Sequence, residues 1–227
     1  DQEQAILKLL NRTFINPQKD SVLFELYWAI KIIENNSEDY QLELIDEGQN
    51  MIASWLKDNL RYKVYHDSIG SNRVNWLIDL DELNDVENEF FKRKILSRKK
   101  ARNISKIFSS KLNSNYWEGR PDIVIEIVDE NKDQLKKIII GEVKHSNIEN
   151  TVKDGLKELL DYIYLVRKTG KEKFINDYEN KENNLEIIGL LLFDQITIDD
   201  EQIVKGLKLK LCDSTPLYIK TTNLNLN

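Results

Sequence analysis

The chain has 227 residues, a formal net charge of −6 and a charged fraction of 32%. This length suits one large domain, and the apolar content indicates a folded chain rather than a disordered one. The single cysteine, Cys212, excludes a disulfide framework, and no apolar run approaches the roughly 20 residues of a membrane span. Zinc-ligand spacing of Cys and His is also absent. We therefore expect a globular protein without a membrane partner, in a reducing compartment such as the cytoplasm.

Two helices are expected at the start of the chain. Residues 3–15 have a helical pattern that ends before Pro17, which predicts a helical extension over residues 1–20. The helix-like opening suggests a fragment of a longer protein. A second helix is expected after Asp20 or Ser21, because the following apolar residues recur at helical spacing.

The next segment is less regular. Residues 41–60 are ambiguous, and we expect a strand that leads into a helix at 51–58. Residues 61–66 alternate like a strand, while residues 74–80 fit either a strand or the start of the next helix.

Charge is distributed unevenly in the middle of the chain. Residues 79–89 hold six acids and no bases, and residues 92–111 hold nine bases and no acids. The basic block is either a solvated helix face or an arm that follows the phosphates of a nucleic acid. We expect a charged helical insertion at about 81–112, with Lys99, Lys100 and Arg102 as candidate nucleic-acid contacts.

The clearest strands are 122–128 and 136–144, which a charged turn joins as a hairpin. A helix is expected to follow, with Thr151 and Asp154 as a capping box and Gly170 as its stop.

A further helix is expected around 171–181, and the almost fully apolar residues 185–193 predict a buried strand. The order predicts an α/β fold, with a mixed central sheet flanked by helices. We expect a single domain with its core at 21–200 and strands or a tail at 201–227.

The hairpin carries the candidate chemistry. Side chains alternate along a strand, so Glu142 and Lys144 project from one face, roughly 6.5–7 Å apart along the chain. Asp122 opens the partner strand, so its carboxylate can approach that of Glu142. Two converging carboxylates repel unless one takes up a proton or a cation lies between them. Oxygen ligands suit Mg²⁺ or Mn²⁺, and the carbonyl of Val143 is a third candidate ligand.

These residues resemble the signature of the PD-(D/E)xK, or restriction-endonuclease-like, nuclease superfamily. The signature corresponds to Pro121-Asp122, a hairpin and then Glu142-Val143-Lys144, and the resemblance covers residues 120–193. It implies a restriction-endonuclease-like core of αβββαβ order. It also implies a metal-dependent endonuclease, with Asp122, Glu142 and Lys144 as catalytic residues and DNA as the expected substrate. The alternative is structural, with Asp122 as a turn residue and Glu142 and Lys144 as an ion pair on an edge strand.

Other positions are similar to parts of the superfamily. In 24-FELYW-28 the resemblance implies that Glu25 is an acid on the first core helix that reaches the metal site. Some members have a Gln followed four residues later by a Tyr that contacts DNA. Here the two positions are Glu158 and Tyr162, so the Tyr agrees and the Gln does not. Arg120 is a candidate phosphate contact, or else a surface residue. Together these features are similar to McrC-like nuclease subunits of modification-dependent restriction systems.

Several aromatic and histidine side chains receive no catalytic role. We expect His145 to point away from the catalytic face, His66 has no partner motif, and Tyr116 and Trp117 are expected to pack.

Two other function classes remain open. The chain is also consistent with an inactive nucleic-acid-binding or assembly module that keeps the nuclease fold. A third interpretation is a protein-interaction domain that uses its acidic and basic blocks to pair with a partner or with itself. A homodimer, or a place in a larger restriction complex, is the expected assembly for cutting both strands of a duplex.

Overall fold

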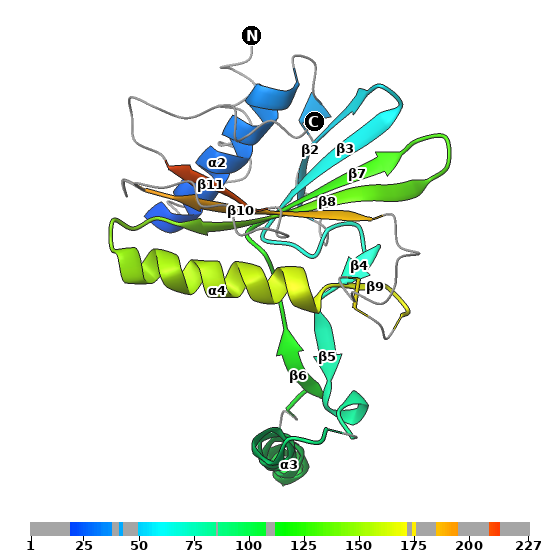
Figure 1. The fold of residues 1–227 in the computed structure, drawn as a ribbon, viewed down its shortest axis with the longest axis vertical. Coiled ribbons are helices and arrows are strands. Elements are labelled where there is room, and N and C mark those ends of the chain that lie inside the picture. Colours follow the sequence, from blue (N-terminus) through cyan, green and yellow to red (C-terminus); the bar gives the residue numbers. More distant parts are fainter. Residues whose placement is uncertain are drawn as a thin grey trace. The chain divides into compact units, whose positions relative to one another are not determined.

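The computed structural model describes residues 19–37, 41–42, 50–84, 86–107, 112–171, 174–175, 185–194 and 209–213. The chain divides into two compact units (Figure 1). The larger unit comprises residues 1–75 and 120–227, and the smaller unit is Trp76–Gly119. The helix expected at 3–15, most of the helix expected at 171–181 and most of the tail at 201–227 lie outside the described residues.

The larger unit is built on a seven-stranded sheet with the order β1-β2-β3-β7-β8-β10-β11 (Figure 1). These strands are β1 (Gln41–Leu42), β2 (Met51–Lys57), β3 (Leu60–His66), β7 (Ile123–Asp129), β8 (Gln134–Lys144), β10 (Glu186–Phe193) and β11 (Leu209–Asp213). Neighbours from β1 to β8 are antiparallel, whereas β10 runs parallel to both β8 and β11. The sheet is therefore mixed, which confirms the expected α/β class.

The helix expected at 51–58 was wrong, because this segment is strand β2. It forms a hairpin with β3, and Asp58 and Asn59 between them have φ angles of 51° and 62°. Two left-handed residues make the turn that best matches the twist of paired strands, and Asp and Asn tolerate that conformation. This turn chemistry favours the hairpin over a helix for the apolar residues of β2.

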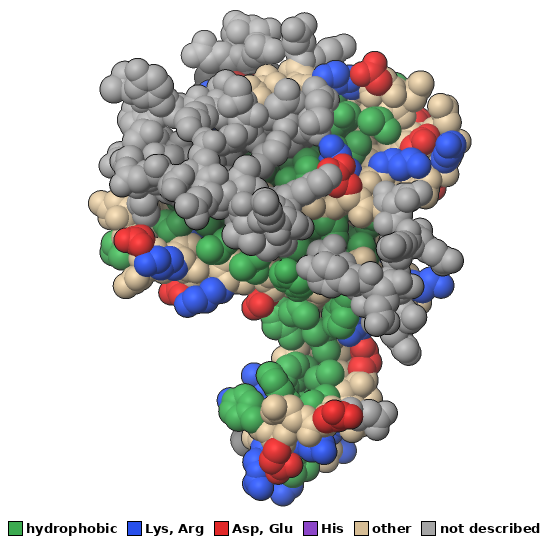
Figure 2. All heavy atoms as spheres, viewed as in Figure 1, with side chains coloured by type: hydrophobic (Ala, Val, Ile, Leu, Met, Phe, Trp, Pro, Cys, Tyr) green, Lys and Arg blue, Asp and Glu red, His purple; other side chains and the backbone are tan. Residues whose placement is uncertain are grey.

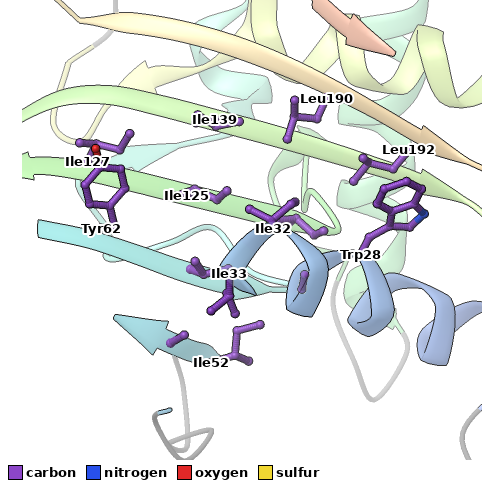
Figure 3. Close-up of a cluster of buried hydrophobic side chains, with 14 of the residues drawn as sticks. Trp28, Ile32, Ile33, Ile52, Tyr62, Ile125, Ile127, Ile139, Leu190 and Leu192 are labelled. Atoms are coloured by element: carbon purple, nitrogen blue, oxygen red, sulfur yellow. The ribbon is translucent and has the colours of Figure 1, made fainter. Parts of the chain in front are cut away.

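The sheet carries helices on both faces, as expected. Helix α2 (Asp20–Asn36) covers one face, and helix α4 (Glu149–Leu165) packs against β8 and β10 on the other (Figure 1). The side chains of α2 meet every second residue of the central strands, because strand side chains alternate between faces. Figure 3 shows this cluster, which includes Trp28, Ile32, Ile33, Ile125, Ile127, Ile139, Leu190 and Leu192.

The capping box expected at Thr151 was wrong. Helix α4 begins at Glu149, after the N-cap residue Ile148, whose side chain makes no capping hydrogen bond. The helix also ends before Gly170, because Val166 is already extended and leads into the short strand β9 (Arg167–Lys168). Strand β9 pairs with β4 (Val74–Asn75), so a tertiary contact ends the helix one turn earlier than the glycine would.

A buried carboxylate fixes the loop that follows β3. Glu126 on β7 is fully buried, and it accepts the N–H of Ser71 at 2.8 Å and the hydroxyl of Ser71 at 2.5 Å. Gly70 has a φ of 78°, and a Cβ there would lie 2.5 Å from Glu126 Oε1. Only glycine lets the loop backbone come this close to the carboxylate. The loop is thereby held beside the start of β7, where the candidate site lies.

The smaller unit contains the charged stretch. A two-stranded sheet pairs β5 (Leu77–Asp79) with β6 (Asn115–Glu118), and the segment between them forms the 3₁₀ turns η1 (Leu80–Glu82) and η2 (Ser105–Ile107) and the helix α3 (Glu89–Ile104). Asn88 caps α3 by accepting the N–H groups of two residues in its first turn. Among the described residues of both units, no helix combines the length and apolar character required to cross a bilayer.

Candidate active site

Asp122 and Glu142 meet where β7 begins and β8 ends. Ile123 pairs with Gly141 across the two strands, so the next residues, Asp122 and Glu142, lie opposite each other. The N–H of Val143 donates to Asp122 Oδ2 at 2.8 Å, which fixes the Asp122 carboxylate at the end of the hairpin. The side chain of Glu142 is only 3% exposed. The strand register therefore places two carboxylates together in a largely buried position, as the sequence predicted.

Both carboxyl groups resist ionisation. Burial raises the pKa of Glu142 to about 9, with a contribution from the negative charge of Asp122 and an opposing one from Lys144. Burial also raises the pKa of Asp122 to about 6, although the hydrogen bond from Val143 lowers it, and the charge of Glu25 adds to the increase. A cation beside these carboxylates would offset both the cost of burying their charges and their mutual repulsion, because it favours the ionised form of each.

The oxygens around this point suit a hard divalent cation. Glu142 Oε2 is buried, and no donor among the described residues reaches it. The described residues contain no ready-made cluster of three His, Cys, Asp or Glu side chains. Mg²⁺ does not require one, because it commonly binds one or two carboxylates and fills its other positions with water and substrate phosphate. Asp122, Glu142 and the main-chain oxygen of Val143 therefore fit such an ion.

Lys144 lies between two carboxylates. Its Nζ donates to Glu142 Oε1 at 2.5 Å and to Glu158 Oε2 of α4 at 2.6 Å. Burial by itself would lower the pKa of Lys144, but these two hydrogen bonds outweigh it, so the pKa is raised. The ammonium is therefore charged at neutral pH. Glu158, whose role the sequence left in doubt, is the partner from the helix.

Helix α4 approaches the stem of Lys144 at Gly155. A Cβ at this glycine would lie 2.6 Å from both Cγ and Cε of Lys144. Such distances are too short for any side chain, so the glycine provides the space that the lysine occupies.

Glu25 lies on the Asp122 side of the site and pairs with a histidine. Glu25 Oε2 on α2 is 2.8 Å from His66 Nε2 at the end of β3, and both side chains are largely buried. The charges of Glu25 and His66 both act on Asp122. The charge of Glu25 reaches Asp122, but Glu25 does not form a three-carboxylate cluster with Asp122 and Glu142 among the described residues, so its predicted role as a metal ligand stays a prediction. Its observed partner is His66, a contact that the sequence did not suggest. The position of His66 in its strand could have indicated this contact. Strand β3 pairs with β7, and its last residue, His66, lies opposite Ile123, next to Asp122.

Arg120 and Tyr162 lie at the same end of the sheet. Arg120 Nε donates to the carbonyl of Asp67 at 2.7 Å and is 2.9 Å from its Oδ1, while the guanidinium side chain stays 57% exposed. The hydroxyl of Tyr162 donates to the carbonyl of Arg120 at 3.5 Å. Burial raises the pKa of Tyr162, and the negative charges of Glu142 and Asp122 add to the increase. Arg120 and Tyr162 are therefore neighbours of Asp122 and Glu142, and their predicted contact with nucleic acid stays a prediction.

His145 faces away from this site, as expected. Its ring lies 4.8 Å from that of Phe24 on α2, and its Nε2 is 3.7 Å from Asp194 Oδ2.

Lys99, Lys100 and Arg102 belong to helix α3 of the smaller unit. Lys99 Nζ donates to Asn84 Oδ1 at 2.8 Å, and Arg102 Nη1 donates to Asp81 Oδ2 at 3.3 Å. Part of the basic block thus pairs with the acidic stretch of its own unit.

The larger unit therefore gathers six predicted residues at one end of its sheet, namely Glu25, Arg120, Asp122, Glu142, Lys144 and Tyr162, and adds His66, Gly155 and Glu158. Comparisons of the chain with family models, with curated proteins and with solved structures find no match.

Proposed function

We propose that the chain is a metal-dependent endonuclease with a restriction-endonuclease-like core. One observation carries this proposal. Two buried carboxylates with raised pKa values face each other across a hairpin, and a lysine ammonium lies 2.5 Å from one of them. Burying two like charges together is costly. An ion pair with a purely structural role would need only one acid beside the lysine, so the second carboxylate favours a functional site. The arrangement suits hydrolysis of a phosphodiester, with DNA as the favoured substrate and a role in a restriction or defence system.

The proposal gives the carboxylates and Lys144 different roles. Asp122 and Glu142, with the carbonyl of Val143 and with Glu25 nearby, would hold Mg²⁺ or Mn²⁺. The ion would supply Lewis acidity toward the scissile phosphate and lower the pKa of bound water. Lys144 carries a fixed positive charge, which can orient the attacking water or stabilise the charge that develops on the phosphate.

The direct test is cleavage of supercoiled plasmid DNA. We expect wild-type protein to nick or cut the plasmid with Mg²⁺ or Mn²⁺ and to be inactive in EDTA. Asp122→Ala should be inactive in both conditions, because it removes one of the two facing carboxylates. Wild-type protein that cuts nothing, or Asp122→Ala protein that cuts as well as wild type, would contradict the proposal.

The basic helix α3 is the candidate tracking arm for the phosphate backbone. Only Ile95 of this helix is buried, and Lys99 and Arg102, four and seven residues later, share its face. Lys94 and Lys100 are exposed and lie outside that face. Figure 2 shows Lys, Arg and apolar side chains intermixed on the visible surface of the smaller unit. The proposal therefore assigns phosphate contacts to Lys94 and Lys100 ahead of Lys99 and Arg102.

This assignment predicts a difference between two matched double variants. Lys94→Gln/Lys100→Gln should weaken DNA binding and reduce the salt dependence of the affinity by about one counterion for each lysine lost. Lys99→Gln/Arg102→Gln removes the same charge from the face that pairs with Asn84 and Asp81, and it should leave the salt dependence nearly unchanged. Binding titrations with Ca²⁺ over a range of salt concentrations measure both. Equal slopes for the two double variants would contradict the assignment.

A protein-interaction role for the smaller unit has one observation in its favour. Helix α3 exposes large apolar side chains, including Phe90 at 62% and Phe91 at 49%. Exposed aromatic residues are frequent anchors in protein interfaces. If this role is correct, Phe90→Ser/Phe91→Ser changes the oligomeric state in analytical ultracentrifugation and leaves DNA binding intact. An inactive module that keeps only DNA binding would bind equally well in EDTA and cut nothing.

A further inference from the structure

Lys144 is held in place from outside its own strand. Lysine has a long, flexible stem, and ordering it costs much rotamer freedom. The side chain of Lys144 is nevertheless only 21% exposed, and two elements define its position. Strand β8 provides Glu142, and helix α4 provides Glu158 and Gly155.

The two carboxylates that bind Lys144 are not equivalent. Glu142 faces Asp122 and has the unpartnered oxygen at which a cation would bind. A carboxylate that shares its charge with a divalent ion attracts a neighbouring ammonium less, and the ion itself repels that ammonium. Glu158 is on a different element, and its Oε2 accepts from Lys144 at 2.6 Å, so it can keep attracting the ammonium when an ion binds the free oxygen of Glu142.

Gly155 affects the position of Lys144 because it has no side chain. Glycine in the interior of a 17-residue helix lowers helix stability relative to alanine, so its presence calls for a reason. The reason here is contact, because any Cβ would overlap the Lys144 stem at 2.6 Å. The helix backbone and Glu158 therefore set the path of the stem and the position of its charged end.

We propose that Glu158 and Gly155 are positioning residues that hold the Lys144 ammonium at the reacting phosphate when the metal ion engages Glu142. This inference rests on the proposed nuclease function and adds a specific role for helix α4. Glu158 and Gly155 would act through Lys144 rather than as metal ligands.

The test compares kcat and KM for DNA cleavage among four variants. Glu158→Ala and Gly155→Ala should each lower kcat by roughly 10²-fold, the cost of misplacing a catalytic group by about 1 Å. KM and DNA binding with Ca²⁺ should stay at the wild-type level. Glu158→Gln keeps an oxygen that accepts from Lys144, so it should recover most of the lost kcat. Glu149→Gln is the matched control, because it removes an α4 carboxylate that pairs with Lys153 at 2.6 Å instead of with Lys144.

Loss of folding is separated from loss of positioning by thermal unfolding of the same samples. Alanine normally stabilises a helix relative to glycine, so reduced activity of Gly155→Ala without helix loss supports displacement of Lys144. Wild-type kcat in both Glu158→Ala and Gly155→Ala would overturn the inference and leave the nuclease function standing. An equal loss in Glu158→Gln and Glu158→Ala would overturn the role of Glu158 as a hydrogen-bond acceptor. A wild-type protein that is inactive with every divalent ion would overturn both the function and the inference.

Discussion

Replacing Lys144 with alanine is expected to lower the rate of DNA cleavage by roughly 10²–10³-fold, the usual effect of removing one positioned charge from a transition state. The ammonium lies 2.5 Å from a candidate metal ligand and keeps its charge at neutral pH, so the substitution removes a positioned positive charge from the candidate site. Single-turnover cleavage of a labelled duplex measures the rate.

Lys144→Met is the matched control for this variant. Methionine keeps an apolar stem that can lie against Gly155, but it carries no charge. Unlike alanine, it leaves little cavity beside α4, so a loss of activity in Lys144→Met reports the loss of the charge. Both variants should bind duplex DNA in Ca²⁺ much as wild type does, because phosphate contacts elsewhere provide most of the affinity. Full activity of Lys144→Met would show that the ammonium takes no part in catalysis.

The parts of the fold that the sequence predicts well are those with strong local signals. Strands β7, β8 and β10 are long apolar runs, and helix α2 has a clear helical period, so their existence follows from the pattern alone. The Asp122, Glu142 and Lys144 arrangement follows as well, because a hairpin and side-chain alternation define which residues face each other.

The parts that the sequence did not predict depend on contacts between distant segments. Strand β2 depends on the left-handed pair Asp58 and Asn59, which a search for helical spacing overlooks. The roles of His66 and Glu158 depend on how β3 and α4 lie against the hairpin. Nothing in the local sequence around Gly155 indicates that a lysine eleven residues earlier fills the space beside it. In the candidate site, the residues that face each other along the hairpin could be predicted from the sequence, whereas the contacts made between different layers of the fold could not.

Glu142→Gln is expected to abolish cleavage and, at the same time, to stabilise the metal-free protein at alkaline pH. Glu142 has a pKa of about 9 in the folded chain, raised by burial and by the charge of Asp122. A carboxyl group with a raised folded-state pKa contributes stability at low pH, and that contribution is lost as the pH rises through the folded-state value. In EDTA, the wild-type free energy of unfolding should therefore fall by up to about 1.4 kcal/mol per pH unit toward pH 9.

The contributions of Asp122 and Glu142 to the pH dependence of stability can be distinguished, because the two groups ionise over different pH ranges. Asp122 is half ionised at its pKa of about 6 and largely ionised above pH 7, and Lys144 stays charged because its pKa is raised. Above pH 7, the wild-type free energy of unfolding should fall with a slope of about one proton, which is the proton of Glu142. The glutamine of the variant cannot ionise, so this slope should be absent there. Denaturant unfolding in EDTA at several pH values should show a falling curve for wild type and a nearly flat one for Glu142→Gln. Parallel curves would contradict the burial of an ionisable carboxylate here.

Addition of Mg²⁺ should reverse this trend in wild type alone. A metal ion binds the ionised carboxylates and displaces protons, so the stabilisation that it confers should grow as the pH rises. Glu142→Gln should gain little from Mg²⁺ at any pH, although the metal-free variant is the more stable protein. The same substitution would then remove both the cost of the buried charge and the activity, which is the behaviour expected if the repulsion between Asp122 and Glu142 is retained for binding a metal. Equal stabilisation of both proteins by Mg²⁺ would place the ion elsewhere.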